Sequence, residues 1–385
     1  MNDFTFNDGQ VVAIDKAVQW YRDAQDRKPG TKKYFFLAGY AGTGKTSVAR
    51  AIADRCARPS RVVYIAPTGK AASRLRAKGA FGAKTLHKFM YVFVGEMKGR
   101  PEFEMKGSLD ETPDLIVLDE ASMVGKYDFE NLLRLNIPIL CLGDLGQLEP
   151  IDDESYFIED NCDYNLEKIE RNGGNITRAA FFVRTGGRLP PREYDDVKVR
   201  DGMVPGLEIK KHTDADSVIL CSYNSTRQHM NFKARAMLGY AGDKLPRPGE
   251  KLVCTFNQHT YNIMNGEQVI FHKFSEIPPG DLQPGEDPEF IKLIHFTSLT
   301  NQVDGIAKCN LGCFLCYDEE DKARQMKMSG GWDFGYALTI HKSQGSEWIR
   351  VLIIEEFMRG SPYEKLMYTG ITRAIEHLTI YRANA

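Results

Sequence analysis

Short apolar runs alternate along this chain with stretches in which apolar residues recur at helical spacing. A run that is apolar at successive positions is typical of a strand buried on both faces, and strands that alternate with helices favour parallel sheets. The pattern therefore predicts an α/β fold built from strand–helix units. The expected strands are Tyr34–Ala38, Val62–Ala66, Leu115–Leu118, Ile137–Leu142, Val218–Ser222, Val351–Ile354 and Leu378–Tyr381.

Changes of texture divide the chain. Paired glycines and prolines with mixed charge between residues 173 and 205 predict the passage between two α/β lobes. Prolines and glycines punctuate short alternating segments from about 245 to 331, which is typical of a small antiparallel barrel. Around 88–112, aromatic residues alternate loosely with glycines, as in a short hairpin, although an ordinary surface loop fits equally well. We expect a first lobe over 1–172 with the hairpin at about 88–112, a second lobe over 173–245 and 331–385, and a barrel over 246–330.

Composition and charge narrow the function classes only slightly. The formal net charge of −2 gives no overall basic signature, so binding of nucleic acid would need a local groove. No apolar stretch approaches the length of a membrane helix, and the first residues lack the basic and apolar regions of a signal peptide. We therefore expect a cytoplasmic protein that does not bind a membrane.

The strongest chemical motif follows the first expected strand and reads Gly39-Tyr-Ala-Gly-Thr-Gly-Lys45-Thr46. It fits the phosphate-loop pattern G-x-x-x-x-G-K-[ST] between a strand and a helix. The glycines let backbone N–H groups point at phosphate oxygens, while the lysine reaches the β- and γ-phosphates and the threonine ligates Mg²⁺. The motif predicts binding of a nucleoside triphosphate by Gly42, Thr43, Gly44, Lys45 and Thr46.

A second motif ends another expected strand and reads Leu115-Ile-Val-Leu-Asp119-Glu120. An acidic pair at a strand end suits ATP hydrolysis, because one carboxylate can hold Mg²⁺ and the other can polarise the attacking water. We assign the metal to Asp119, together with Thr46, and the water to Glu120. A phosphate loop with an acidic pair occurs in many ATPases, so these two motifs alone leave the task of the enzyme open.

Three cysteines gather in the segment Cys309-Asn-Leu-Gly-Cys313-Phe-Leu-Cys316. Their spacing could serve zinc if a distant residue such as Cys254 or His295 supplied a fourth ligand. No second C-x-x-C pair exists, and the interspersed leucine and phenylalanine favour a packed strand with buried thiols over a zinc site.

Further motifs, in order along nearly the whole chain, resemble those of the superfamily 1 helicases. Within that superfamily they are most similar to the branch that contains the RecD subunit and the phage Dda helicase. The first-half motifs are Asn7-Asp8-Gly9-Gln10, Ala66-Pro67-Thr68-Gly69-Lys70, Thr85-Leu86-His87, Gly143-Asp144-Leu145-Gly146-Gln147 and Leu166-Glu-Lys-Ile-Glu-Arg171. Those of the second half are Ser222-Tyr223-Asn224, Asn265-Gly266-Glu267, Thr339-Ile-His341-Lys342-Ser343-Gln344-Gly345-Ser346-Glu347 and Tyr368-Thr-Gly370-Ile-Thr372-Arg373.

The resemblance implies two RecA-like lobes and a role for each matched residue. It implies that Gln10 pairs with an adenine edge, that Gln147 senses the γ-phosphate, and that Arg171 and Arg373 complete the ATP site. Glu347 belongs to a motif that links the nucleotide to the bound strand. The residues implied to contact DNA are Pro67, Thr68, His87, Asn224, Thr339, His341 and Lys342.

Structural roles are open for several of these residues. The arginines at 171 and 373 could form salt bridges that only support the fold, and His87 and His341 could be satisfied turn or helix residues. The aromatic residues near Phe89, at the expected hairpin, could form a wedge that splits a duplex or could belong to the core.

The sequence therefore predicts an ATP- and Mg²⁺-dependent DNA helicase, with 5′→3′ movement on single-stranded DNA implied by the resemblance alone. Its partners would be single-stranded DNA, duplex junctions, and replication or recombination proteins, with a monomer as the implied state. Two alternatives stay open: an ATP-gated DNA-binding or loading subunit of a larger complex, and a motor directed at RNA, because no residue identifiable here reads the 2′-hydroxyl.

Overall fold

The computed structural model describes residues 5–97, 100–107, 109, 111–150, 153–169, 174–261, 263–282, 286–315 and 330–382. The chain divides into two compact units, Met1–Arg184 and Thr185–Ala385. The division falls at the end of helix α6 (Asn175–Arg184), later than the expected residue 172. None of the helices in the described ranges has the length and apolar content that a membrane crossing requires.

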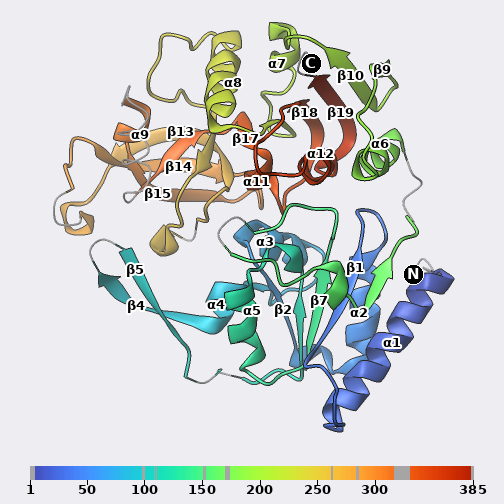
Figure 1. The fold of residues 1–385 in the computed structure, drawn as a ribbon. Helices are drawn as coiled ribbons and strands as arrows, with labels where there is room; N and C mark the ends of the chain where they lie inside the picture. Colours follow the sequence, from blue (N-terminus) through green and yellow to red (C-terminus); the bar gives the residue numbers. More distant parts are fainter. Residues whose placement is uncertain are drawn as a thin grey trace. The chain divides into compact units, whose positions relative to one another are not determined.

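The first unit is a parallel six-stranded sheet in the order β3-β2-β6-β7-β1-β8. Apolar strands with helices on both faces give the expected α/β architecture (Figure 1). The strands are β1 (Tyr34–Gly39), β2 (Val62–Ala66), β3 (Lys84–Thr85), β6 (Leu115–Leu118), β7 (Ile139–Gly143) and β8 (Tyr164–Leu166). The helices are α1 (Asp8–Gln25), α2 (Lys45–Cys56), α3 (Gly69–Ala77), α4 (Leu86–Met90), α5 (Lys126–Leu133) and α6.

Two apolar clusters hold this sheet between its helices. On one face, side chains of α1 and α2 pack on alternate residues of the strands, such as Phe35 and Leu37. On the other face, α4 and α5 pack on the intervening residues, such as Phe36. Because both faces are covered, the loops at the strand ends rest on a rigid base.

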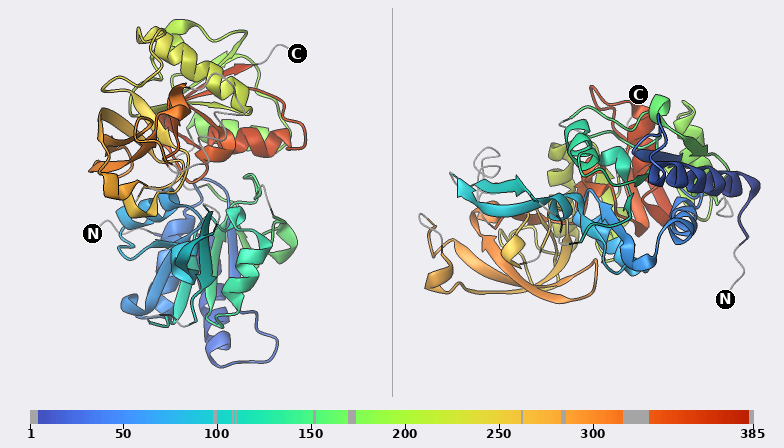
Figure 2. Two further views of the ribbon diagram at one scale, coloured as in Figure 1. Left: turned by 90° about the vertical axis from the view of Figure 1, so that its left-hand side faces the viewer. Right: turned by 90° about the horizontal axis from the view of Figure 1, so that it is seen from below.

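A two-stranded antiparallel hairpin, β4 (Tyr91–Met97) and β5 (Arg100–Met105), follows α4 and projects from the first unit (Figures 1 and 2). The expected hairpin is thus confirmed over the alternative of an ordinary loop. Phe89 is 5% exposed and belongs to the core, so the wedge interpretation is wrong for this residue.

The second unit contains a six-stranded sheet in the order β17-β11-β18-β19-β10-β9, in which only β9 runs antiparallel to its neighbour. Its strands are β9 (Arg192–Glu193), β10 (Val197–Asp201), β11 (Ser217–Cys221), β17 (Ala337–Thr339), β18 (Trp348–Ile354) and β19 (Ala374–Arg382). Its helices are α7 (Gly206–Lys210), α8 (Asn224–Met237), α11 (Ile340–Ser343) and α12 (Tyr363–Ile371).

An antiparallel sheet in the order β15-β14-β13-β12-β16 is inserted between α8 and β17. It consists of β12 (Lys251–Cys254), β13 (Gln268–Glu276), β14 (Ile291–Ser298), β15 (Asp304–Asn310) and β16 (Trp332–Phe334), with the short helix α9 (Gly312–Leu315) after β15. The expected barrel is therefore a five-stranded sheet with two edges. At one point these edges meet, because the N–H of Asn310 donates to the carbonyl of Gly330.

Candidate functional site

The carboxyl edge of the first sheet carries the phosphate loop, the acidic pair, the motif of Gln147 and both motifs of this unit that are implied to contact DNA. Parallel strands end at the same edge, so segments far apart in the sequence become neighbours there. Strand β1 leads into the phosphate loop, β7 into Asp144 and β6 into Asp119. Strand β2 ends just before Thr68, and β3 ends at Thr85. The structure thus places the nucleotide motifs beside the two motifs implied to contact DNA.

The phosphate loop has the backbone that its glycines predict. Gly42 and Gly44 have φ values of 85° and 80°, in the left-handed region that side chains disfavour. No side chain caps the start of α2, so its first N–H groups are available to an anion. The Lys45 ammonium donates to the carbonyls of Gly39 and Tyr40. This donor set fits a triphosphate.

Gln10 lies against the phosphate loop and is 1% exposed. Its Nε2 donates to the carbonyl of Thr43 at 3.0 Å, and its Oε1 accepts from the backbone N–H of Asn7 at 3.1 Å. The Asn7 side chain accepts in turn from the N–H of Gln10, which completes a capping box at the start of α1. Gln10 therefore fastens α1 to the loop, and its pairing with adenine stays a prediction.

Asp119 and Glu120 lie beside the loop at the end of β6. Glu120 has φ 52° and ψ 39°, and its N–H donates to Asp119 Oδ1 at 2.9 Å. Burial, followed by the adjacent Glu120 charge, raises the pKa of Asp119 to about 6, while Lys45 and Arg74 act in the opposite direction. The nearby cations therefore do not fully offset the cost of burying the Asp119 charge beside Glu120, and two neighbouring carboxylates in this situation fit a site for a divalent cation.

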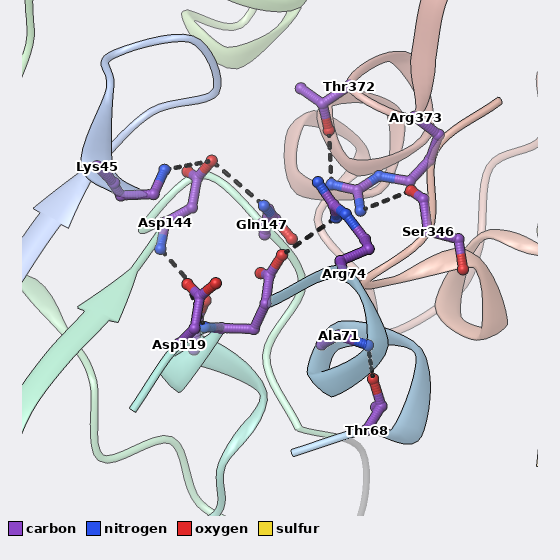
Figure 3. A network of polar contacts seen from close by, with 12 residues as sticks. Lys45, Thr68, Ala71, Arg74, Asp119, Asp144, Gln147, Ser346, Thr372 and Arg373 are labelled. Atoms are coloured by element: carbon purple, nitrogen blue, oxygen red, sulfur yellow. Dashed lines mark hydrogen bonds and ion pairs between the residues drawn. The ribbon is translucent and has the colours of Figure 1, made fainter. Parts of the chain in front are cut away.

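Asp144 links the lysine of the phosphate loop to Gln147 (Figure 3). Its carboxylate is 1% exposed, accepts from the N–H of Gly146 at 3.0 Å and from Gln147 Nε2 at 3.3 Å, and lies 4.0 Å from Lys45 Nζ. The Asp144 N–H donates to Ser122 Oγ at 3.3 Å. Gln147 Oε1 is buried and has no hydrogen-bond partner within the described ranges. A buried amide oxygen of this kind fits contact with a ligand.

The DNA motifs of the first unit begin helices. Thr68 caps α3 by accepting from the N–H of Ala71 at 3.2 Å, and Thr85 caps α4 by accepting from Lys88 at 3.2 Å. Pro67 lies half-buried in the turn before α3. His87 is exposed, and its ring lies 5.4 Å from that of Tyr91 at the base of the hairpin.

The DNA motifs of the second unit also follow strand ends, those of β11 and β17. Thr339 caps α11, burial lowers the pKa of His341, and Lys342 is exposed. Asn224 begins α8 and accepts from Arg227 Nε at 3.3 Å. Glu356 belongs to none of the sequence motifs, and its carboxylate accepts from the N–H groups of Ser222 and Tyr223 just before α8.

Glu347 and Arg373 lie at the opposite edge of the second sheet, immediately before β18 and β19. Arg373 is 3% exposed and donates to the carbonyl oxygens of Thr369 and Ser346 and to Thr372 Oγ1 (Figure 3). These contacts give it a structural role within its own unit. Its expected contact with ATP stays a prediction, and Arg171 lies outside the described residues.

The cysteine segment lies in the core of the inserted sheet. Cys254, Cys309 and Cys313 are fully buried, and burial raises the pKa of each of the first two thiols, that of Cys254 to about 12. Across the part of the chain that the structure describes, no group of three or more His, Cys, Asp or Glu could hold a metal ion. His295 instead lies 2.7 Å from Ser275 Oγ through its Nε2, and Cys316 lies outside the described residues.

Comparisons with known proteins agree with this arrangement. Residues 24–176 match the family model of an AAA domain, and residues 334–381 match that of a UvrD-like helicase C-terminal domain. The chain is 25% identical over 351 residues to the ATP-dependent RecD2 DNA helicase of Deinococcus radiodurans, covering 88% of this chain and 45% of the relative. It is 24% identical to a probable conjugal transfer protein TraA of Sinorhizobium fredii, covering 94% of this chain and 32% of the relative. The chain thus spans less than half the length of these curated relatives.

Two solved structures share the fold nearly end to end. A structure of two coordinating Pif1 helicases at forked double-stranded DNA has a TM-score of 0.57 and 16% identity, covering 98% of this chain and 92% of that chain. A Bacteroides Pif1 helicase in complex with ADP-AlF3 and single-stranded DNA has a TM-score of 0.54 at the same identity and coverage. The chain thus contains segments that match an AAA domain and a UvrD-like helicase C-terminal domain, shares its fold with these Pif1 structures, and is similar along most of its length to the RecD2 helicase.

Proposed function

We propose that this chain is an ATP-dependent DNA helicase that moves 5′→3′ along single-stranded DNA and separates duplex DNA. The observation that carries the proposal is the shared sheet edge, where the phosphate loop, the acidic pair and Gln147 lie beside the helices capped by Thr68 and Thr85. The similarity to RecD2, a DNA helicase that depends on ATP, supports the same reaction. The direction of movement rests on the resemblance to the RecD and Dda branch.

The first unit supplies the residues for ATP hydrolysis. Lys45 would leave its loop carbonyls to contact the β- and γ-phosphates. Gln147 Oε1 would accept a hydrogen bond from the attacking water, and its Nε2 would sense the γ-phosphate as a donor. Glu120 would orient that water. Mg²⁺ held by Thr46 and Asp119 would neutralise phosphate charge. In this proposal Arg171 adds positive charge as the reaction proceeds, and Arg373 would do so by exchanging contacts within its own unit for the nucleotide.

The strand contacts would come from both units. Pro67, Thr68 and His87 would contact the sugar–phosphate backbone from the first unit, and their position at helix starts suits phosphate oxygens. In the second unit these contacts would come from Asn224, Thr339, His341 and Lys342. Contacts of this kind carry little sequence preference, which suits a translocating enzyme. We propose that the protein acts on single-stranded DNA at duplex junctions, as a monomer.

A strand-displacement assay tests the proposal. Duplexes that carry a 5′ or a 3′ single-stranded tail would be mixed with the protein, ATP and Mg²⁺, with Lys45→Ala as the inactive control. We expect ATP-dependent separation of the 5′-tailed duplex only. Hydrolysis stimulated by DNA without separation of either duplex would contradict the helicase proposal and favour an ATP-gated binder, and separation confined to RNA tails would favour an RNA motor.

A further inference from the structure

Arg74 connects the DNA motif that follows β2 to the nucleotide motif that follows β6. It lies on α3, the helix that Thr68 caps after β2, and its Nη1 lies 3.9 Å from Oε1 of Glu120, at the end of β6. The strands β2 and β6 are adjacent in the sheet, so this ion pair spans the step from a DNA motif to the nucleotide motifs (Figure 3). The sequence motifs do not include Arg74.

The side of α3 that carries Arg74 is basic. Lys70 lies four residues before Arg74, so the two side chains share one side of the helix and continue the DNA motif that begins at Pro67. The side chains of Arg74 and Glu120 retain 28% and 17% of their exposure, so solvent and a phosphate can reach the pair. Arg76, on the same helix, donates instead to the carbonyl of Ala83 at 2.8 Å.

We infer that Arg74 is a positioning residue that restrains Glu120 while no DNA is bound and releases it when a strand binds, so that DNA stimulates ATP hydrolysis. This inference rests on the proposed function. An arginine can form two parallel hydrogen bonds to a phosphate, and these are stronger than a 3.9 Å contact to a carboxylate. A phosphate bound along α3 therefore competes for the guanidinium.

The release changes where the Glu120 carboxylate can point. In the ion pair with Arg74 the carboxylate is held toward α3, so it does not turn to the attacking water that it would orient. Once Arg74 turns to a phosphate, the Glu120 carboxylate can turn to face the γ-phosphate and its attacking water. Thr68 links this change to binding, because it fixes the start of the helix that carries Arg74.

The test compares Arg74→Ala with wild type, using steady-state hydrolysis with and without oligo(dT). Without DNA, we expect kcat of Arg74→Ala to rise about fivefold, which corresponds to about 1 kcal/mol. KM for ATP stays unchanged, because Arg74 acts through Glu120. Stimulation by oligo(dT) shrinks by the same factor. Arg74→Lys keeps the cation and restores part of the restraint, whereas the matched control Arg76→Ala leaves the DNA-free rate at the wild-type value.

A second measurement compares the salt dependence of oligo(dT) affinity in Arg74→Ala and wild type. Because Arg74 contacts one phosphate of the bound strand, the slope of log K against log salt should be smaller in magnitude by about 0.7 in Arg74→Ala. An unchanged or lower DNA-free rate in Arg74→Ala, with wild type stimulated by DNA, overturns the inference and leaves the proposed function standing. If wild type hydrolyses ATP and DNA does not stimulate it, that result contradicts the proposed function and the inference together. A thermal melt of each variant establishes that the comparison is made between folded proteins.

Discussion

Replacing Gln147 by leucine should separate stability from activity. The substitution keeps the approximate size of the side chain and removes both atoms of its amide. In the structure Nε2 donates to Asp144 at 3.3 Å, while Oε1 is buried with no hydrogen-bond partner in the described part of the chain. If Oε1 accepts a hydrogen bond from the attacking water, its burial without a partner is a cost to stability that catalysis requires.

The expected energies follow from these contacts. Loss of the hydrogen bond to the charged Asp144 should cost about 1.5–3 kcal/mol, and removal of the unsatisfied oxygen should return about 1–3 kcal/mol. Asp144 keeps the N–H of Gly146 and the nearby Lys45 ammonium, so its charge is not left uncompensated. The net change in the free energy of unfolding should therefore lie within about 2 kcal/mol of zero. Loss of a donor or acceptor that acts in the transition state typically lowers kcat by about 10²–10³.

Phosphate release at saturating ATP, Mg²⁺ and oligo(dT) would measure kcat, and urea unfolding would measure stability. Gln19→Leu, on the exposed side of α1, is the matched control and should change neither quantity. An unchanged kcat for Gln147→Leu would refute the role of this side chain. A loss of stability above about 3 kcal/mol would refute the balance of energies given above.

Other substitutions test separate parts of the structure. Lys45→Ala should lower kcat at least about 100-fold and leave binding of labelled oligo(dT) intact by fluorescence anisotropy, so a normal kcat would remove this lysine from the ATP site. Gln10→Ala loses both the capping box and the bond to Thr43, and we expect about 1–2 kcal/mol less stability and a higher KM for ATP; an unchanged KM would contradict its role in holding the loop. Arg227→Met removes the guanidinium that lies 2.7 Å from the carboxylate of Asp333, whose side chain is 2% exposed, and should lower the free energy of unfolding in urea by about 3–5 kcal/mol. Adding Asp333→Asn should recover most of this loss, and equal losses in the single and double variants would argue against the ion pair.

The fold could be predicted where burial dominates the sequence. The apolar runs Val62–Ala66 and Leu115–Leu118 coincide with β2 and β6, because strands covered on both faces need apolar residues at every position. Strand β10 (Val197–Asp201) was missed, since it alternates valine with charged residues. Strand β8 (Tyr164–Leu166) was missed because it is short and lies at an edge of the sheet.

The site could be predicted only as far as its motifs are contiguous. The phosphate loop and the acidic pair are visible because each is a short segment of fixed spacing. Arg74 and Ser122 act through neighbours on other strands, and the order of β2, β6, β7 and β1 that brings them together is not written in any local pattern. Gln10 shows the opposite case, since its motif is plain while its contacts in the structure are to the protein itself.

The central claim is that nucleotide and single-stranded DNA communicate through one unit. Linkage requires that, if DNA changes nucleotide affinity, each nucleotide state changes DNA affinity by the same factor. The most direct measurement is the anisotropy of a labelled oligo(dT) titrated with the protein alone, with ADP, and with a non-hydrolysable ATP analogue, each with Mg²⁺. The account predicts clearly different affinities in the ADP and ATP-analogue states, and lost differences in Lys45→Ala. Equal affinities in all states of the wild type would contradict it.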